Sequence, residues 1–147
     1  MNADLLDAVQ LALSGHADIA RQRLGELWKT LPPDDFFHRC VLAHYLADLQ
    51  PDPNAELHWD QVALDAALAA SSESFDGQIP DVTRDAFLPS LHLNLASSYE
   101  RTLSLDLAKR HAALALDAAG SLPPTPLAES TRAAIGRICV RLGIESE

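Results

Sequence analysis

The sequence is poor in aromatic and β-branched residues. Phe, Trp and Tyr make up only 5% of the 147 residues, while Ala and Leu dominate the apolar 48%. Because aromatic and β-branched residues favour strands, whereas Ala and Leu favour helices, this composition predicts an all-α protein. The length and apolar content suit one folded domain with a sizeable core.

Long apolar runs and a disulfide framework are also missing. No apolar stretch approaches the roughly 18 residues that a membrane span requires. The first ten residues, MNADLLDAVQ, lack the basic start of a secretory signal. The two cysteines, Cys40 and Cys139, lie in apolar helical patterns, as reduced core residues do. We therefore expect a cytoplasmic protein without a membrane partner.

Positive charge is scarce. The formal net charge is −10, so phosphate backbones would be repelled, and we expect no nucleic-acid partner. Residues 51–100 carry a charge of −8 and residues 101–147 a charge of +1. This acidic middle either serves solubility or steers a basic partner.

Catalytic and metal-binding motifs are not found. There is no G-x-S-x-G, no P-loop and no G-x-G-x-x-G. Cys40 and His44 have the i, i+4 spacing of two zinc ligands, but no second pair of ligands accompanies them. His92 and His111 are interpreted as residues that cap polar edges or line a groove. We expect no enzyme, no metal and no cofactor.

Glycine, proline and capping residues divide the chain into helical segments. Gly15, Pro32-Pro33, PDPN at 51–54, Gly120 with Pro123-Pro124, and Gly143 mark the boundaries. Asp34-Asp35 and Asn54 are the predicted N-caps of the segments that follow them. The expected helices are 3–14, 17–30, 35–50, 54–71, 105–119 and 126–142. One more helix is expected between 81 and 103. It begins near Asp81 or Thr83, or it covers 89–103 after a short turn at 83–88. Residues 72–82 are predicted to form a loop.

Two of the helical pairs share one template. When Ala8 is aligned with Ala96, the matched positions are Leu11 and Tyr99, Gly15 and Leu103, Ala20 and Ala108, Leu24 and Ala112, Leu27 and Ala115, and Pro32 and Gly120. A middle unit fits from Ala43, 35 residues after Ala8, once the four-residue insertion PDPN is allowed for. Such self-similarity is typical of helical repeats.

This template resembles the tetratricopeptide repeat (TPR). The best match is Leu95-Ala96-x2-Tyr99 followed by Ala108-x3-Ala112. The resemblance implies an α-solenoid of three antiparallel hairpins, at about 2–33, 35–71 and 83–120, closed by a capping helix at about 126–142. Three features depart from the family: the signature Trp is replaced in all three units, Leu103 stands where a turn glycine is usual, and Trp59 stands where a small residue is expected.

An ordinary Ala/Leu helix bundle is the alternative fold. In either fold, the recurring alanines allow two helices to pack closely. Helix axes approach to about 8 Å only where the side chains between them are small. We expect Ala96 and Ala108 to lie at such a crossing. Four leucines are expected to fill the space beside it: Leu91, Leu95, Leu107 and Leu114.

The resemblance also implies a function. In this family the first helix of each hairpin lines a concave face that binds peptides. The positions carried over are Phe37, Cys40, Val41, His44 and Asp48 in the second unit, and Leu93, Asn94, Ser97, Glu100 and Arg101 in the third. The lysines that hold a peptide carboxylate in some members are missing, so the lining instead suits a peptide with an apolar anchor or a basic group near Asp48 or Glu100.

Two other classes of function remain open at this point. The chain could be a structural protein that self-associates as a homodimer through Leu5, Leu6 and Val9. A small hydrolase-like enzyme would need His44, Asp48 and a serine in contact within a deep pocket.

Overall fold

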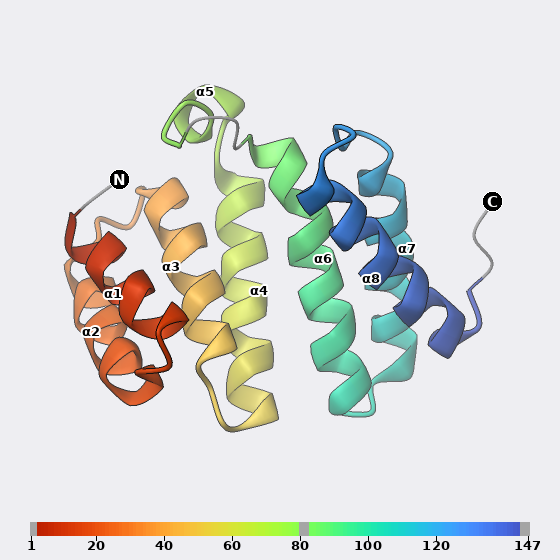
Figure 1. The fold of residues 1–147 in the computed structure, drawn as a ribbon, viewed down its shortest axis with the longest axis horizontal. Helices are drawn as coiled ribbons and strands as arrows, with labels where there is room; N and C mark the ends of the chain where they lie inside the picture. Colours follow the sequence, from red (N-terminus) through yellow and green to blue (C-terminus); the bar gives the residue numbers. More distant parts are fainter. Residues whose placement is uncertain (1–2, 80–82, 145–147) are drawn as a thin grey trace. The chain divides into compact units, whose positions relative to one another are not determined.

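The computed structural model describes residues 3–79 and 83–144, and in these ranges every regular element is a helix, as the composition predicts (Figure 1). The elements are α1 (Ala3–Leu13), α2 (Ala17–Thr30), α3 (Phe36–Asp48), α4 (Pro53–Ala69), α5 (Ser72–Phe75), α6 (Arg84–Arg101), α7 (Leu105–Ala119) and α8 (Pro126–Leu142). They form two compact units, Met1–Val82 and Thr83–Glu147.

The first unit contains two pairs of helices. A short turn joins α1 to α2, and the PDPN turn joins α3 to α4, so that each pair packs as an antiparallel hairpin (Figure 1). Helix α3 also contacts α1, α2 and the one-turn helix α5. Trp28 of α2 and Trp59 of α4 meet edge to face with their ring centroids 5.0 Å apart, and the Arg39 guanidinium lies over the Trp28 ring. Both tryptophans are therefore packing residues.

The second unit is one hairpin closed by a further helix. Helices α6 and α7 pair closely, and α8 packs against both of them. The core of this unit combines small residues of the hairpin with larger residues of α8: Ala96, Ala108, Ala112, Ala115, Ala119, Ile135, Ile138, Cys139 and Leu142. Helix α8 thus supplies the bulk that the alanines of α7 lack.

The alanines of the template are buried in all three hairpins. Ala8 and Ala20 in the first hairpin and Ala96 and Ala108 in the third are 0% exposed, and Ala43 in the second is equally buried. In the second hairpin Ala63 is also buried, whereas Trp59, at the template position of Ala20 and Ala108, remains partly exposed. Small side chains therefore lie inside each pair of helices, as the close approach of two helices requires.

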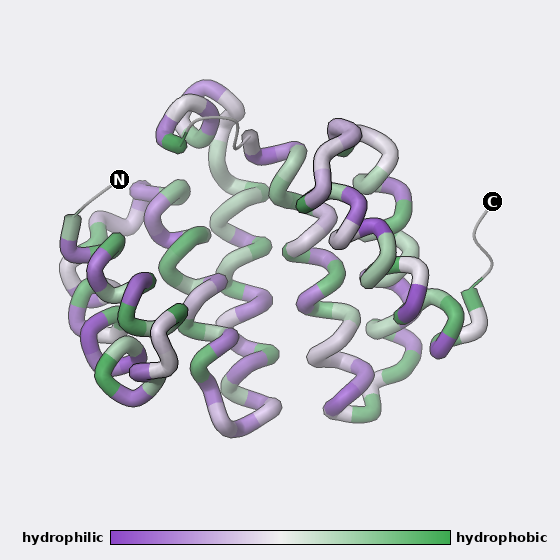
Figure 2. The backbone as a smooth tube through the Cα atoms, in the orientation of Figure 1, coloured by the Kyte–Doolittle hydropathy of each residue, from purple (hydrophilic) through white to green (hydrophobic). Residues whose placement is uncertain are grey.

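Two of the four leucines predicted to flank this crossing do not do so. Leu91 and Leu95 are buried, but Leu107 and Leu114 are 40% and 38% exposed. Helix α7 buries one alanine stripe of period three to four, Ala108, Ala112, Ala115 and Ala119, which leaves its leucines on other faces. Hydrophobic and hydrophilic residues alternate along the helices (Figure 2).

The helix starts follow capping chemistry, with one correction. The Asp35 carboxylate accepts a hydrogen bond from the His38 backbone N–H, as predicted for an N-cap. Asn54, however, is not a cap. Asp52 caps α4 by accepting from the Asn54 backbone N–H, and Pro53 takes the first helical position, where a missing N–H is harmless.

The start of α6 confirms one of the expected alternatives, a start near Thr83. Thr83 is its N-cap and accepts from the Ala86 backbone N–H, so residues 84–88 belong to the helix rather than to a separate turn. Pro89 lies inside the helix, fully buried, instead of in the first turn. The alternative start near Asp81 lies outside the described residues.

The turns of the first and third hairpins are alike in backbone conformation. Gly15 has φ +86° and Leu103, at the matched template position, has φ +65°. A left-handed conformation suits glycine but crowds the Cβ of leucine, at a cost of about 1–2 kcal/mol. Leu103 is 80% exposed, so no packing compensates for this strain.

Replacing Leu103 with glycine should therefore stabilise the chain. We expect Leu103→Gly to raise the free energy of unfolding by about 0.5–1 kcal/mol, since relief of strain exceeds the extra entropy of the unfolded chain. The reciprocal variant Gly15→Leu should lower the free energy of unfolding, because it places a Cβ in a left-handed backbone conformation. A Cβ at Gly15 would meet no atom within 4 Å, so backbone strain alone causes the loss. Urea denaturation measures both, and a loss of stability in Leu103→Gly would contradict the assignment of strain.

Candidate peptide-binding surfaces

One face of α3 carries four of the five residues predicted to bind a peptide, and their exposure increases along the helix. Phe37 and Val41 are 3% and 7% exposed, His44 is half-buried and Asp48 is exposed. These four residues recur at intervals of three to four, so they share a helix face. Only its C-terminal part, around His44 and Asp48, is open to a ligand in this structure.

Cys40 does not line this face. It is fully buried, and burial raises the pKa of its thiol to about 12, so the sulfur stays protonated at neutral pH. A protonated, buried thiol is neither a nucleophile nor a ready metal ligand. The prediction that Cys40 contacts a peptide is thus corrected, because its side chain belongs to the core.

His44 is the titratable group of the α3 face. Burial lowers the pKa of its imidazole, and the nearby Asp48 carboxylate opposes that shift. Burial, with a smaller effect of the same carboxylate, raises the pKa of the neighbouring Tyr45 hydroxyl. The face therefore presents a neutral imidazole beside an exposed carboxylate at neutral pH.

The segment predicted as the loop 72–82 contains α5, which covers part of the α3 face. Phe75 is 0% exposed, and its ring centroid lies 5.0 Å from that of Phe37 at an interplanar angle of 73°. Ser71 caps α5 by accepting from the Ser74 backbone N–H. Residues 72–75 are thus helical rather than loop, and their one large side chain packs on a predicted site residue. Residues 80–82 lie outside the described residues.

The five predicted residues of α6 have different surroundings. Leu93 is half-buried and packs against the core of its unit. Asn94 and Ser97 are half-buried. Arg101 is exposed and donates hydrogen bonds to the hydroxyl oxygens of Ser97 and Ser98.

Glu100 is engaged by the chain itself. Arg141 of α8 donates from Nε and Nη2 to the two carboxylate oxygens of Glu100, at 3.2 and 3.1 Å. This fork-to-fork pair ties α8 to α6, which are 41 residues apart in sequence. A basic group on a peptide would have to compete with Arg141 for Glu100, so Asp48 is the more accessible of the two carboxylates proposed to attract such a group.

A histidine pair in the second unit was not predicted. His92 of α6 and His111 of α7 place their Nδ1 atoms 3.1 Å apart, while their ring centroids are 5.3 Å apart, so each ring turns its Nδ1 edge toward the other. The Tyr99 ring lies nearly parallel to that of His111, at 5.6 Å. The template could have found this pair, because His92 and Tyr99 are seven residues apart on the helix face that packs on α7.

The pair makes the stability of the second unit depend on pH. An Nδ1···Nδ1 hydrogen bond needs one nitrogen without a proton, so it cannot form when both rings are charged. Burial lowers the pKa of both histidines, with the neighbouring His111 adding to the effect on His92, and Arg110 to that on His111. The unfolded chain then takes up protons at a higher pH than the folded one, and stability declines as the pH falls below about 6.5.

We expect a double variant His92→Asn, His111→Asn to show a smaller loss of unfolding free energy between pH 7.5 and pH 5 than the wild type. Urea denaturation at several pH values measures that difference, and NMR titration of the ring protons measures the two pKa values directly. Lys109→Gln on α7, which changes one exposed charge without touching the pair, is the control. Equal pH dependence in the double variant and the wild type would contradict the account.

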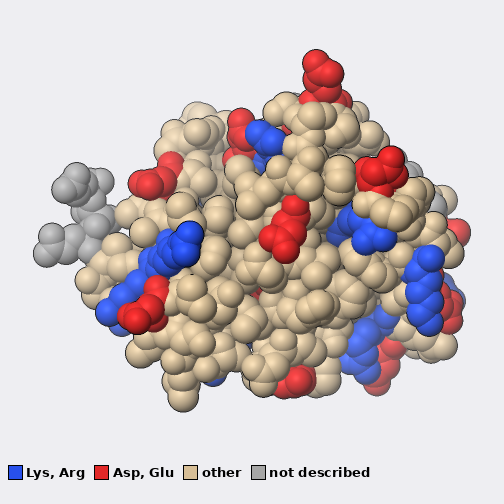
Figure 3. All heavy atoms as spheres, turned by 180° about the vertical axis from the view of Figure 1, so that it is seen from behind, with Lys and Arg blue, Asp and Glu red and all other residues tan. Residues whose placement is uncertain are grey.

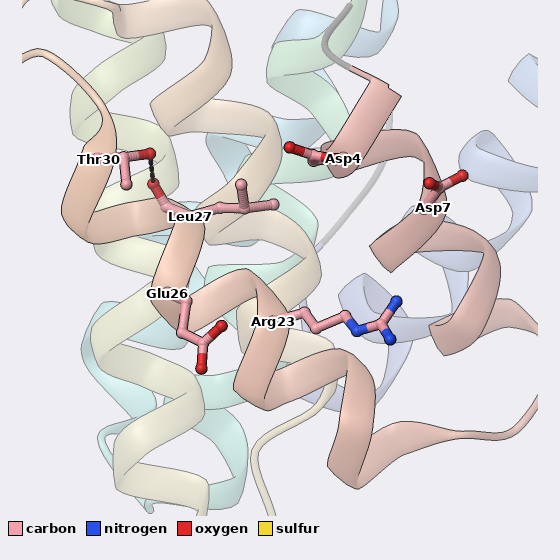
Figure 4. Close-up of a pocket in the computed structure, with 6 residues that line it drawn as sticks. All are labelled: Asp4, Asp7, Arg23, Glu26, Leu27 and Thr30. Atoms are coloured by element: carbon pink, nitrogen blue, oxygen red, sulfur yellow. Dashed lines mark hydrogen bonds between the residues drawn. The ribbon is translucent and has the colours of Figure 1, made fainter.

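A hollow of about 330 Å³ lies between α1 and α2, lined by Asp4, Asp7, Arg23, Glu26, Leu27 and Thr30 (Figure 4). Arg23 reaches from α2 toward α1, whereas the Thr30 hydroxyl folds back and donates to the Leu27 carbonyl at 2.7 Å. Four of its six lining residues are charged, whereas a typical small-molecule pocket is lined mostly by hydrophobic side chains. Of the residues predicted for self-association, Leu5 and Val9 are buried and Leu6 is exposed.

The surface shown in Figure 3 carries acidic and basic residues in small groups separated by uncharged areas. Within residues 3–79 and 83–144, no three His, Cys, Asp or Glu side chains are grouped so that they could hold a metal ion. None of the described helices is both long and apolar enough to cross a membrane.

Comparison with protein-family models, with curated proteins and with solved structures finds no match to this chain.

Proposed function

We propose that this chain is a non-enzymatic, TPR-like α-solenoid module that binds a protein or peptide on the first helices of its second and third hairpins. The observation that carries the proposal is the two-sided character of α3. One side packs into its unit through Ala43, Leu46 and Ala47, which are 0–2% exposed. The other side leads from the covered Phe37 to the open Asp48.

The chemistry of the open side indicates the kind of partner. His44 supplies a largely neutral imidazole, and Asp48 supplies an exposed carboxylate at the end of the helix. A basic side chain on the partner would gain from Asp48, and an apolar one from the ring of His44. The net charge of −10 likewise favours encounter with a basic peptide.

The test is a charge reversal at Asp48. Partners are first captured with the wild-type chain, and their affinities are then measured directly for Asp48→Lys and for Asp117→Lys, an exposed acidic position on α7. We expect Asp48→Lys to weaken binding by about tenfold or more and Asp117→Lys to leave it nearly unchanged. Circular dichroism checks that both variants fold. Equal binding by both variants and the wild type would refute a site on α3.

A further inference from the structure

We propose that the N-terminal end of the α3 face is a seat for an aromatic side chain, filled here by the chain's own Phe75 and taken over on binding by an aromatic residue of the partner. This inference rests on the proposed peptide-binding function of α3 and names the anchor that the partner should carry.

The seat is built from aromatic rings. Phe75 meets Phe37 edge to face at 5.0 Å, and Phe37 in turn meets the ring of His38 at 5.1 Å and 88°. Edge-to-face pairs at such distances are favourable beyond the area that they bury. The His38 ring is held in place by the Asp35 carboxylate, whose oxygens lie 2.9 and 3.0 Å from Nδ1. An aromatic anchor therefore finds a preformed partner on α3.

The segment that fills the seat is a single helical turn. Ser72–Ser74 are exposed, and so are Asp76–Gln78, whereas Phe75 between them is completely buried. The hydrogen bonds between Ser71 and Ser74, and from the Gln78 amide to the Ser74 carbonyl, are local to the segment. An isolated turn is not stable by itself, so the packing of Phe75 on Phe37 contributes to holding α5 in place. Gly77, at φ +87°, provides a turn immediately after it.

Replacement of Phe75 requires a partner that binds more of the face than α5 does. A tethered segment competes at an effective concentration in the millimolar range. A partner with only an aromatic residue would gain little over it. One that also reaches Asp48 makes a contact that the α5 segment does not offer, because Glu73 of α5 and Asp76, which follows it, are both acidic.

The spacing of the two contacts follows from the helix. Phe37 and Asp48 are eleven residues apart, or about 16 Å along α3. An extended peptide covers that distance in about five residues. The partner segment should accordingly carry an aromatic residue and a basic residue about five positions apart.

The experiment supplies the anchor in trans. The probe is a synthetic peptide of residues 70–79, ASSESFDGQI, and the matched control peptide has alanine in place of phenylalanine. Binding to the full chain carrying Phe75→Ala, and to the wild type, is followed by NMR shifts of the Val41 methyl groups and the His44 ring. We expect the phenylalanine peptide to bind the variant at least about tenfold more tightly than the wild type, and the alanine peptide to bind neither.

An extended probe tests the second contact. A peptide with lysine five positions after the phenylalanine should bind Phe75→Ala more tightly than the unextended peptide, and adding Asp48→Lys to that variant should remove the gain. If the phenylalanine peptide leaves the Val41 and His44 signals of a folded Phe75→Ala chain unchanged, or binds no better than the alanine peptide, the seat is refuted.

If Phe75→Ala does not fold, Phe75→Leu is tested with the same peptides, and hydrogen exchange of residues 72–76 is measured in the wild type. A seat that can be vacated predicts exchange through local opening, more readily than the amides of α3. Exchange only by global unfolding would overturn the proposal. Two outcomes separate this proposal from the proposed function. If partner binding depends on Asp48 but the phenylalanine peptide does not bind, the seat alone is refuted. If the peptide binds but partner binding does not depend on Asp48, the proposed function alone is refuted.

Discussion

Replacing Ala108 with leucine will lower the free energy of unfolding by about 1–3 kcal/mol or more. Ala108 is 0% exposed and lies in the same core as Ala96 of α6 and Ala112 of α7. Three added carbons have no space where two helices pack on small side chains, so α6 and α7 must separate or adopt strained rotamers. Urea denaturation followed by circular dichroism measures the loss.

The matched control for this prediction is Ala113→Leu on the same helix. Ala113 is exposed, so the same chemical change should alter stability by no more than about 0.5 kcal/mol. A similar loss in both variants would show that leucine disturbs α7 itself and not its contact with α6. No loss in Ala108→Leu would show that the crossing is loosely packed.

Truncating Ile135 to alanine should have a still larger effect, about 2–5 kcal/mol. Ile135 is 0% exposed and belongs to the core that α8 completes over the alanines of α7. Because those neighbours are already small and held at a helix crossing, they cannot collapse into the space that the lost methylene groups leave. The cost therefore includes a cavity as well as lost burial. Thermal and urea denaturation both measure this loss.

Val140→Ala, five residues further along α8, is the control for this variant. Val140 is 79% exposed, so its truncation should change stability by about 0.5 kcal/mol at most. If Ile135→Ala were equally mild, α8 would be a loosely attached helix rather than part of the core. The Arg141–Glu100 pair would then be a surface contact without structural consequence.

Periodicity and breaker residues predict most of the helices because they act locally. The helix starts at Phe36, Leu105 and Pro126 lie within one residue of prediction, since each depends on nearby capping or breaking residues. The start of α6 near Thr83 is one of the predicted alternatives, but Pro89 lies inside the helix, six residues after the N-cap, rather than in the first turn. The one-turn helix α5 has no period to detect, and the burial of Phe75 contributes to holding it in place.

The site residues were predicted from a repeat template, which gives positions but not neighbours. The template placed Asp48 on a face that the structure leaves open, but it could not foresee that α5 would cover Phe37. Nor could it foresee that Arg141 would engage Glu100, because that contact joins residues 41 apart. The leucines of α7 were misplaced for a related reason: both alanine and leucine are apolar, and only packing decides which of the two lies inside.

The claim on which this account depends is that alanines at matched positions bring the two helices of each hairpin into contact. The most direct measurement is the set of NOEs between alanine methyl groups in a chain labelled only at alanine methyls. The account predicts NOEs from Ala96 to alanine methyls of α7 and from Ala8 to Ala20 of α2. If those methyl groups showed NOEs only within their own helices, the hairpins would not be built on alanine contacts, and the binding face assigned to α3 would lose its basis.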